Sequence, residues 1–161
     1  MKNKAVRCGI IAHMETEEII HGLAVKARAA ALRMGAYSTE SKNAALMAIA
    51  DALESMKPRI DAANAEDVAA AKANGISPAM IDRLTLTESR FRSMVDGVRH
   101  VATLPDPVGE LIWERDRPSG IHIRKVRQPF GVIAVVFESR PNVFVDTAAL
   151  CIKTSNAVIL R

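Results

Sequence analysis

Several kinds of residue are scarce in this sequence of 161 residues. The two cysteines, Cys8 and Cys151, lie far apart, so neither a disulfide framework nor a zinc site is predicted. The four histidines are scattered without ligand spacing, which gives no reason to expect a metal. Aromatic residues make up only 4% and the net charge is +4, so nucleic-acid binding, which usually combines basic patches with aromatic stacking, is not expected.

Long apolar runs are also missing. None approaches the roughly 18 to 20 residues that a membrane-spanning helix needs, and the first residues lack the apolar stretch of about 7 to 15 residues found in signal peptides. We therefore expect a cytoplasmic protein that does not enter a membrane. The apolar share of 49% and the charged share of 25% are typical of a folded domain, and the length suits one domain or part of one.

The common glycine-rich motifs are absent as well. No G-x-G-x-x-G, no G-x-x-x-x-G-K-S/T and no G-x-S-x-G occurs, so these cofactor and hydrolase signatures give no support to a function. Cys151 lies in an apolar segment, where cysteine usually acts as a small hydrophobic residue rather than as a nucleophile.

The first hundred residues are predicted to be helical, because apolar residues recur there at helical spacing between capping and breaking residues. We expect helices over 15–35, from Ser38 or Thr39 to Met56, from Pro58 to Asn74, briefly after Pro78, and from Thr87 to about residue 103. The second is expected to bury Ala45, Ile49, Leu53 and Met56, and the last Phe91, Met94, Val95 and Val98.

The pattern changes after Leu104, where two prolines break any helix. Two short alternating segments flank a turn over 116–120 and predict a β hairpin over 111–127 with basic residues on its solvated face. Gly131 to Phe137 is a continuous apolar run typical of a strand buried on both faces of a parallel sheet. A helix over 143–154 and a strand over 157–160 would complete a strand, helix and strand unit, which is the start of an α/β sheet.

The loop between that buried strand and the following helix contains Glu138, Ser139, Arg140 and Asn142. Helix amino termini attract anions, so Arg140 could hold a phosphate or carboxylate, and Asn142 could donate to a carbonyl oxygen that becomes negative during attack. The alternative is an ordinary capped loop, with Asn142 as the helix cap and Arg140 on the surface.

The segment VRQPFGVIAVVFESRPNVFVDTAALCIKTSNAVILR, over 126–161, resembles the signature region of gamma-glutamyl phosphate reductases, also called glutamate-5-semialdehyde dehydrogenases. Upstream, STESKNAALMAIADALE, ANAEDVAAAKANGIS, DRLTLT, LPDPVGE and RPSGIHIRKVR resemble the same family in the same order. The resemblance therefore covers about residue 15 to the end, and residues 1–14 are left as an amino-terminal tail.

The resemblance implies an α/β fold of the aldehyde dehydrogenase type, with a helical amino-terminal part, the 111–127 hairpin as an oligomerisation arm, and the start of a Rossmann-like parallel sheet. Residues 15–161 would then be an incomplete NADP-binding domain that lacks the catalytic domain. The implied reaction is NADPH-dependent reduction of gamma-glutamyl 5-phosphate to glutamate 5-semialdehyde and phosphate, in proline biosynthesis. A homo-oligomer and functional coupling to glutamate 5-kinase are also implied.

The family resemblance also implies site residues. Glu138, Ser139 and Arg140 would lie near the cofactor, Arg161 would suit the 2'-phosphate of NADPH, and Asn142 would donate to an oxyanion. The nucleophilic cysteine of the family matches neither Cys8 nor Cys151, so the chain by itself is expected to be inactive. Two other hypotheses stay open: another acyl-phosphate or aldehyde dehydrogenase, and a non-catalytic remnant or module that pairs with an intact subunit.

The sequence departs from the usual family pattern at four positions: Gln128, Phe130, Phe144 and Ser155. Ser155 replaces a glycine that commonly precedes the asparagine. If its backbone is left-handed, serine costs up to about 1 to 2 kcal/mol there.

Overall fold

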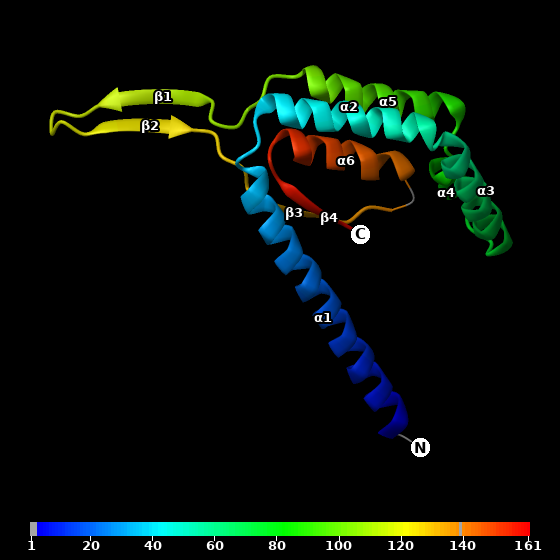
Figure 1. Ribbon diagram of the computed structural model, residues 1–161. Helices are drawn as coiled ribbons and strands as arrows, with labels where there is room; N and C mark the ends of the chain where they lie inside the picture. The colour runs from blue at the N-terminus through cyan, green and yellow to red at the C-terminus, as the bar shows by residue number, and fades with distance from the viewer. Residues whose placement is uncertain (1–2, 139) are drawn as a thin grey trace.

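The computed structural model describes residues 3–138 and 140–161, with side chains described from residue 16 onward. Helix α1 (Asn3–Met34) projects away from the other elements as a long arm (Figure 1). It begins at Asn3 rather than at residue 15, because no proline interrupts this stretch and helix can propagate through it. The backbone of residues 3–14, expected as a tail, is thus continuous with the helix.

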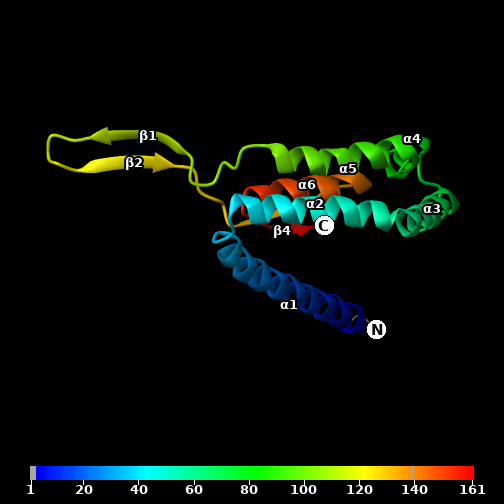
Figure 2. The same cartoon turned by 45° about the horizontal axis from the view of Figure 1, so that its top comes forward.

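Helices α2 (Thr39–Ser55), α5 (Glu88–Thr103) and α6 (Pro141–Lys153) lie against one another (Figure 2). Ser38 caps α2 by accepting a hydrogen bond from the Ser41 N–H at 3.2 Å. Thr87 caps α5 in the same way, so both predicted caps are confirmed. The buried core of this layer consists of Leu46, Ala50, Phe91, Met94, Val95, Val98, Ala102 and Ala149.

The predicted apolar face of α5 is confirmed, whereas that of α2 is partly wrong. Leu46 and Ala50 are completely buried, but Ala45 and Met56, which were expected in the core, are exposed. Because α2 contacts both α5 and α6, its buried stripe lies about one residue further round the helix than the apolar spacing indicates.

Helices α3 (Lys57–Ala73) and α4 (Pro78–Leu84) both have a proline in their first turn, as predicted. Gly75 follows α3 with a left-handed backbone, φ +70°. The side chain of Asn64 ties α3 to the connection between α4 and α5: it donates to the Leu84 carbonyl at 2.9 Å and accepts from the Leu86 N–H at 2.8 Å.

Strands β1 (Leu111–Asp116) and β2 (His122–Val126) pair antiparallel and form the predicted hairpin, which extends well beyond the helices (Figure 1). Its charges pair mainly with one another: Arg124 lies 3.7 Å from Glu114, and Arg127 lies 2.7 Å from Glu110. The basic residues on the hairpin thus form the solvated face that the sequence predicts.

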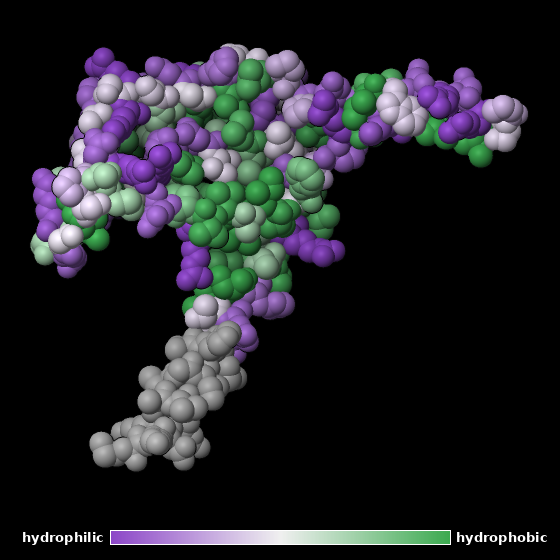
Figure 3. Space-filling model, turned by 180° about the vertical axis from the view of Figure 1, so that it is seen from behind, coloured by the Kyte–Doolittle hydropathy of each residue, from purple (hydrophilic) through white to green (hydrophobic). Residues whose placement is uncertain are grey.

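Strands β3 (Val132–Val135) and β4 (Ala157–Leu160) pair parallel, with α6 as the connection between them, as predicted. The apolar run is of the type buried on both faces of a sheet, but with β4 as its one described partner strand it stays partly open: Val132 is 36% exposed, and Val136, just after the strand, is 83% exposed. Helix α1 contacts both strands but leaves part of their apolar surface open. Seen from behind relative to Figure 1, the molecule has a continuous hydrophobic region in its middle (Figure 3).

None of the described helices is long and apolar enough to cross a bilayer.

Candidate functional site

The loop after β3 leads directly into the amino terminus of α6. Glu138 is exposed at the end of the strand, and Ser139 lies outside the described residues. Arg140 is the N-cap residue of α6, and Pro141 occupies its first position. The proline fixes the backbone where its missing N–H costs nothing, so the helix start is determined by Pro141.

Asn142 lies inside the first turn of α6 and is not its cap, so the ordinary-cap interpretation of this residue is wrong. Its side-chain amide donates to Asp146 Oδ2 at 3.1 Å, one turn further along the helix. An amide NH2 group has two hydrogens, and for the second one the described residues offer no acceptor. Asn142 therefore keeps one donor for a ligand, which suits the predicted oxyanion role.

Arg140 and Asn142 line one cleft of about 510 Å³ between α4, α5 and the start of α6. Both Figure 1 and Figure 2 show that the amino end of α6 faces the side of the molecule on which α4 lies. The remaining lining residues are Asp82, Arg83, Ser89, Arg90, Ser93, Met94 and Asp146. The sequence analysis missed these residues, because their periodicity indicates helices but does not indicate which exposed face meets another element.

Arg161 lies directly after β4, beside the end of β3. Its N–H donates to the Val135 carbonyl at 3.0 Å, and its carbonyl accepts from the Phe137 N–H at 2.9 Å. Arg161 and Glu138 thus follow the two parallel strands at the same edge, the carboxyl edge, where ligands of open α/β sheets bind. The structure brings the predicted residues into two groups: Glu138 with Arg161, and Arg140 with Asn142.

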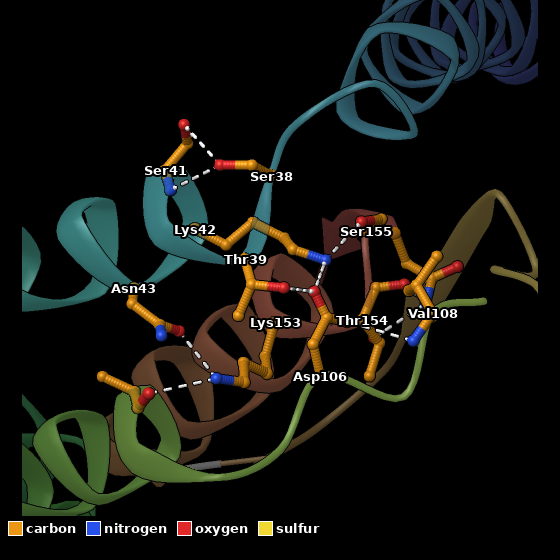
Figure 4. A network of polar contacts seen from close by, with 12 residues as sticks. Ser38, Thr39, Ser41, Lys42, Asn43, Asp106, Val108, Lys153, Thr154 and Ser155 are labelled. Atoms are coloured by element: carbon orange, nitrogen blue, oxygen red, sulfur yellow. Dashed lines mark hydrogen bonds and ion pairs between the residues drawn. The ribbon is translucent and has the colours of Figure 1, made fainter. Parts of the chain in front are cut away.

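A buried polar network that joins α2, the segment before β1 and the end of α6 was also missed by the sequence analysis (Figure 4). The Lys42 ammonium, in a side chain only 3% exposed, forms an ion pair with Asp106 and donates to Ser155 Oγ at 3.1 Å. Asp106 also accepts from the Thr39 hydroxyl at 2.7 Å and from the Val108 N–H at 3.0 Å. Burial by itself would raise the pKa of Asp106, but the hydrogen bonds, that from Lys42 foremost, outweigh it and hold the pKa below its usual value.

Ser155 has a left-handed backbone, with φ +57°, so the condition under which the sequence analysis gave serine an energetic cost applies. Next to it, the Asn156 side chain accepts from the Gly131 N–H at 2.8 Å and donates to the Thr154 hydroxyl at 2.8 Å. These two residues join the end of α6 to the start of both parallel strands. The network therefore fixes the position of α6, on which Asn142 is carried.

The side chains of Cys151, Phe130 and Phe144 line neither the cleft nor the polar network around Lys42 (Figure 4). Cys151 is 4% exposed, and burial raises the pKa of its thiol, as expected for a structural cysteine. Phe130 and Phe144, two departures from the family pattern, are 91% and 54% exposed.

The chain is 50% identical to the gamma-glutamyl phosphate reductase of Opitutus terrae over 144 residues, which is 89% of this chain and 34% of the relative. It is 49% identical to the reductase of Thermobifida fusca over 147 residues, 91% of this chain and 35% of the relative. The chain is a relative of gamma-glutamyl phosphate reductases. No protein-family model matches it.

The backbone agrees with the sequence comparison. Crystal structures of gamma-glutamyl phosphate reductases from Thermotoga maritima and Saccharomyces cerevisiae match with TM-scores of 0.82 and 0.84, each at 38% identity. These matches cover 86% and 87% of this chain, but 33% and 36% of those structures. The resemblance expected from the sequence is confirmed, and the chain spans about a third of the length of the reductases that it matches.

Proposed function

We propose that a longer protein containing these residues reduces gamma-glutamyl 5-phosphate to glutamate 5-semialdehyde and phosphate, with NADPH as reductant, in proline biosynthesis. The observation that carries this proposal is the identity of about 50% to gamma-glutamyl phosphate reductases over about nine tenths of the chain. We further propose that the fold is of the aldehyde dehydrogenase type, with β3 and β4 as part of a larger Rossmann-like sheet. The open apolar surface on β3 supports this.

The residues of this chain suit NADPH at the carboxyl edge of the parallel pair. Arg161 is an exposed cation there and would hold a 2'-phosphate, and Glu138 lies beside it after the neighbouring strand. Bound NADPH would supply the hydride. We expect Ser139 and Arg140 to contact the cofactor from the same loop, and Asn142 to donate its second amide hydrogen to the oxygen of the reacting acyl group.

The covalent step of the proposed reaction needs a thiol that displaces phosphate from the acyl group. Cys151 is unsuited to this step, because it is buried and its pKa is raised rather than lowered. We therefore propose that the nucleophile is a cysteine outside these residues, and that the 161-residue chain by itself is inactive.

The test is to purify the full translated protein that carries these residues and to follow NADPH formation with glutamate 5-semialdehyde, phosphate and NADP. Phosphate-dependent oxidation of the semialdehyde is the expected result. Faster turnover of other semialdehydes than of glutamate 5-semialdehyde would favour another acyl-phosphate dehydrogenase, and no turnover of any of them would contradict the proposal.

The hairpin of β1 and β2 is proposed as an arm that pairs subunits of a homo-oligomer. Ile112, Trp113 and Ile121 are each between 45% and 59% exposed on it, which is unusual for an isolated ribbon in water. Trp113→Ser should then shift the sedimentation profile of the full protein to a smaller species. Functional coupling to glutamate 5-kinase and a cytoplasmic location remain predictions.

A further inference from the structure

The cleft between α4, α5 and α6 contains charges that the protein itself does not neutralise. Two of its charged side chains, Arg90 and Asp82, lie 3.0 Å apart and form an ion pair with each other. Arg83 and Arg140 form no ion pair with any described residue; the one recorded side-chain contact of Arg83 is with the sulfur of Met80, at 3.9 Å. Two cations therefore face the cleft without an anion.

Asp146 provides the opposite charge in the same cleft. It is half-buried, accepts a hydrogen bond from Asn142, and has no cation within ion-pair distance among the described residues. Its other oxygen, Oδ1, faces α5: a methyl group added at Gly97 would lie 3.8 Å from it. A half-buried carboxylate without a cation is unfavourable, because burial removes part of its hydration and no positive charge replaces it.

The unpaired charges of Arg83 and Asp146 form a pattern that suits an amino-acid head group. An α-carboxylate would pair with the Arg83 guanidinium, a group that binds carboxylates in a bidentate manner, and an α-ammonium would pair with Asp146. The hydroxyl groups of Ser89 and Ser93 line the same cleft and add neutral donors and acceptors. The cleft volume of about 510 Å³ lies within the range of roughly 300 to 1,000 Å³ found for small-molecule sites.

We propose that this cleft binds the amino-acid end of the substrate, with Arg83 on its α-carboxylate and Asp146 on its α-ammonium group, while Arg140 remains the cofactor contact. This rests on the proposed function, because it requires a glutamyl substrate. Asn142 and Asp146 are four residues apart on α6, about 6 Å along its axis, so an extended glutamyl chain held at Asp146 directs its γ-carbonyl group toward Asn142. Asp146 is thus the residue that selects an amino acid over a plain dicarboxylate.

The test compares two substrates of the full translated protein: glutamate 5-semialdehyde and 5-oxopentanoate, which lacks only the α-ammonium group. Asp146→Asn should lower kcat/KM for glutamate 5-semialdehyde at least about tenfold more than it lowers that for 5-oxopentanoate, because any change at Asn142, which donates to Asp146, affects both substrates alike. Arg83→Ala should lower kcat/KM for both substrates, mainly through KM, because both carry the carboxylate. Arg92→Ala and Asp96→Asn, exposed on α5 outside the cleft, are the matched controls.

Two results would overturn the proposal while leaving the reductase function intact: an active enzyme in which Asp146→Asn alters the two substrates equally, or one in which Arg83→Ala behaves like Arg92→Ala. Titration of L-glutamate and glutarate by calorimetry gives a readout independent of activity. L-glutamate should bind more tightly than glutarate, and Asp146→Asn should remove the difference. Equal binding of the two ligands to the unaltered protein would contradict the inference, whereas lack of turnover with intact discrimination would contradict only the proposed function.

Discussion

Replacing Asp106 by asparagine tests whether the ion pair with Lys42 holds α2 against the segment that leads into the hairpin. The side chains of Lys42 and Asp106 are 3% and 12% exposed, so the ammonium cannot regain water when its partner loses the charge. Breaking a buried ion pair costs about 3 to 5 kcal/mol. The asparagine carbonyl can still accept from the Val108 N–H, so we expect the lower end, about 3 kcal/mol of unfolding free energy.

The assay is urea denaturation at pH 7, with the free energy of unfolding extrapolated to water. The matched control is Asp61→Asn, which removes one of the two carboxylates paired with Lys57 and leaves Glu88 in place; Asp61 is 43% exposed, and its loss should cost about 0.3 to 0.5 kcal/mol. The reasoning would be refuted if Asp106→Asn cost no more than the control. The double variant Lys42→Met with Asp106→Leu should be more stable than Asp106→Asn, because it leaves no unpaired charge.

The same pair makes stability depend on acid in a defined direction. The folded-state pKa of Asp106 is below its unfolded value, so its contribution is complete above the unfolded pKa of about 3.9 and is lost as the pH falls through the folded pKa. Asp106→Asn should therefore lose its deficit relative to the unaltered protein below about pH 4. A deficit that stays constant down to pH 2 would contradict the role assigned to this carboxylate.

Three further predictions concern single residues and the open surface. Ser155→Ala should be less stable than Ser155→Gly by about 1 kcal/mol in urea denaturation. Both variants lose the hydrogen bond from Lys42, but only alanine keeps the energetic cost of the left-handed backbone. The reverse order would be inconsistent with φ +57° at this position. In a Cys8→Ser background, Cys151 should react with an aromatic disulfide reagent only after unfolding, since its thiol is buried with a raised pKa, and immediate reaction would argue against this. The 161-residue chain by itself should enhance the fluorescence of a hydrophobic dye, because Phe130 and Val136 are 91% and 83% exposed; a cooperative transition without dye binding would speak against an open apolar face.

Local structure could be predicted well, because it depends on residues close in sequence. The caps Ser38 and Thr87 and the proline-started helices α3 and α4 were each predicted from short patterns. The parallel pair of β3 and β4 was predicted from an apolar run followed by a helix. The left-handed backbone at Ser155 was considered as one case, because a glycine is common at this position in the family, but the sequence did not decide it.

Packing decided the features that the sequence analysis missed. The buried role of Lys42 was missed, because a lysine in a helical stretch is usually exposed. Its ammonium contacts Asp106 and Ser155, which are 64 and 113 positions away in sequence. Arg83 and Asp146 enter one cleft because α4 and α6 meet across α5. Periodicity indicates that a helix has a buried side, but not which other element covers it.

The sequence by itself determined the order of the elements, their caps and the relationship to gamma-glutamyl phosphate reductases, because these depend on local backbone preferences and on residue identities along the chain. The tertiary structure decided which charged side chains are paired in the core and which face the cleft unpaired. The physical reason is that burial and pairing depend on contacts between distant segments, and only the packed fold defines those contacts.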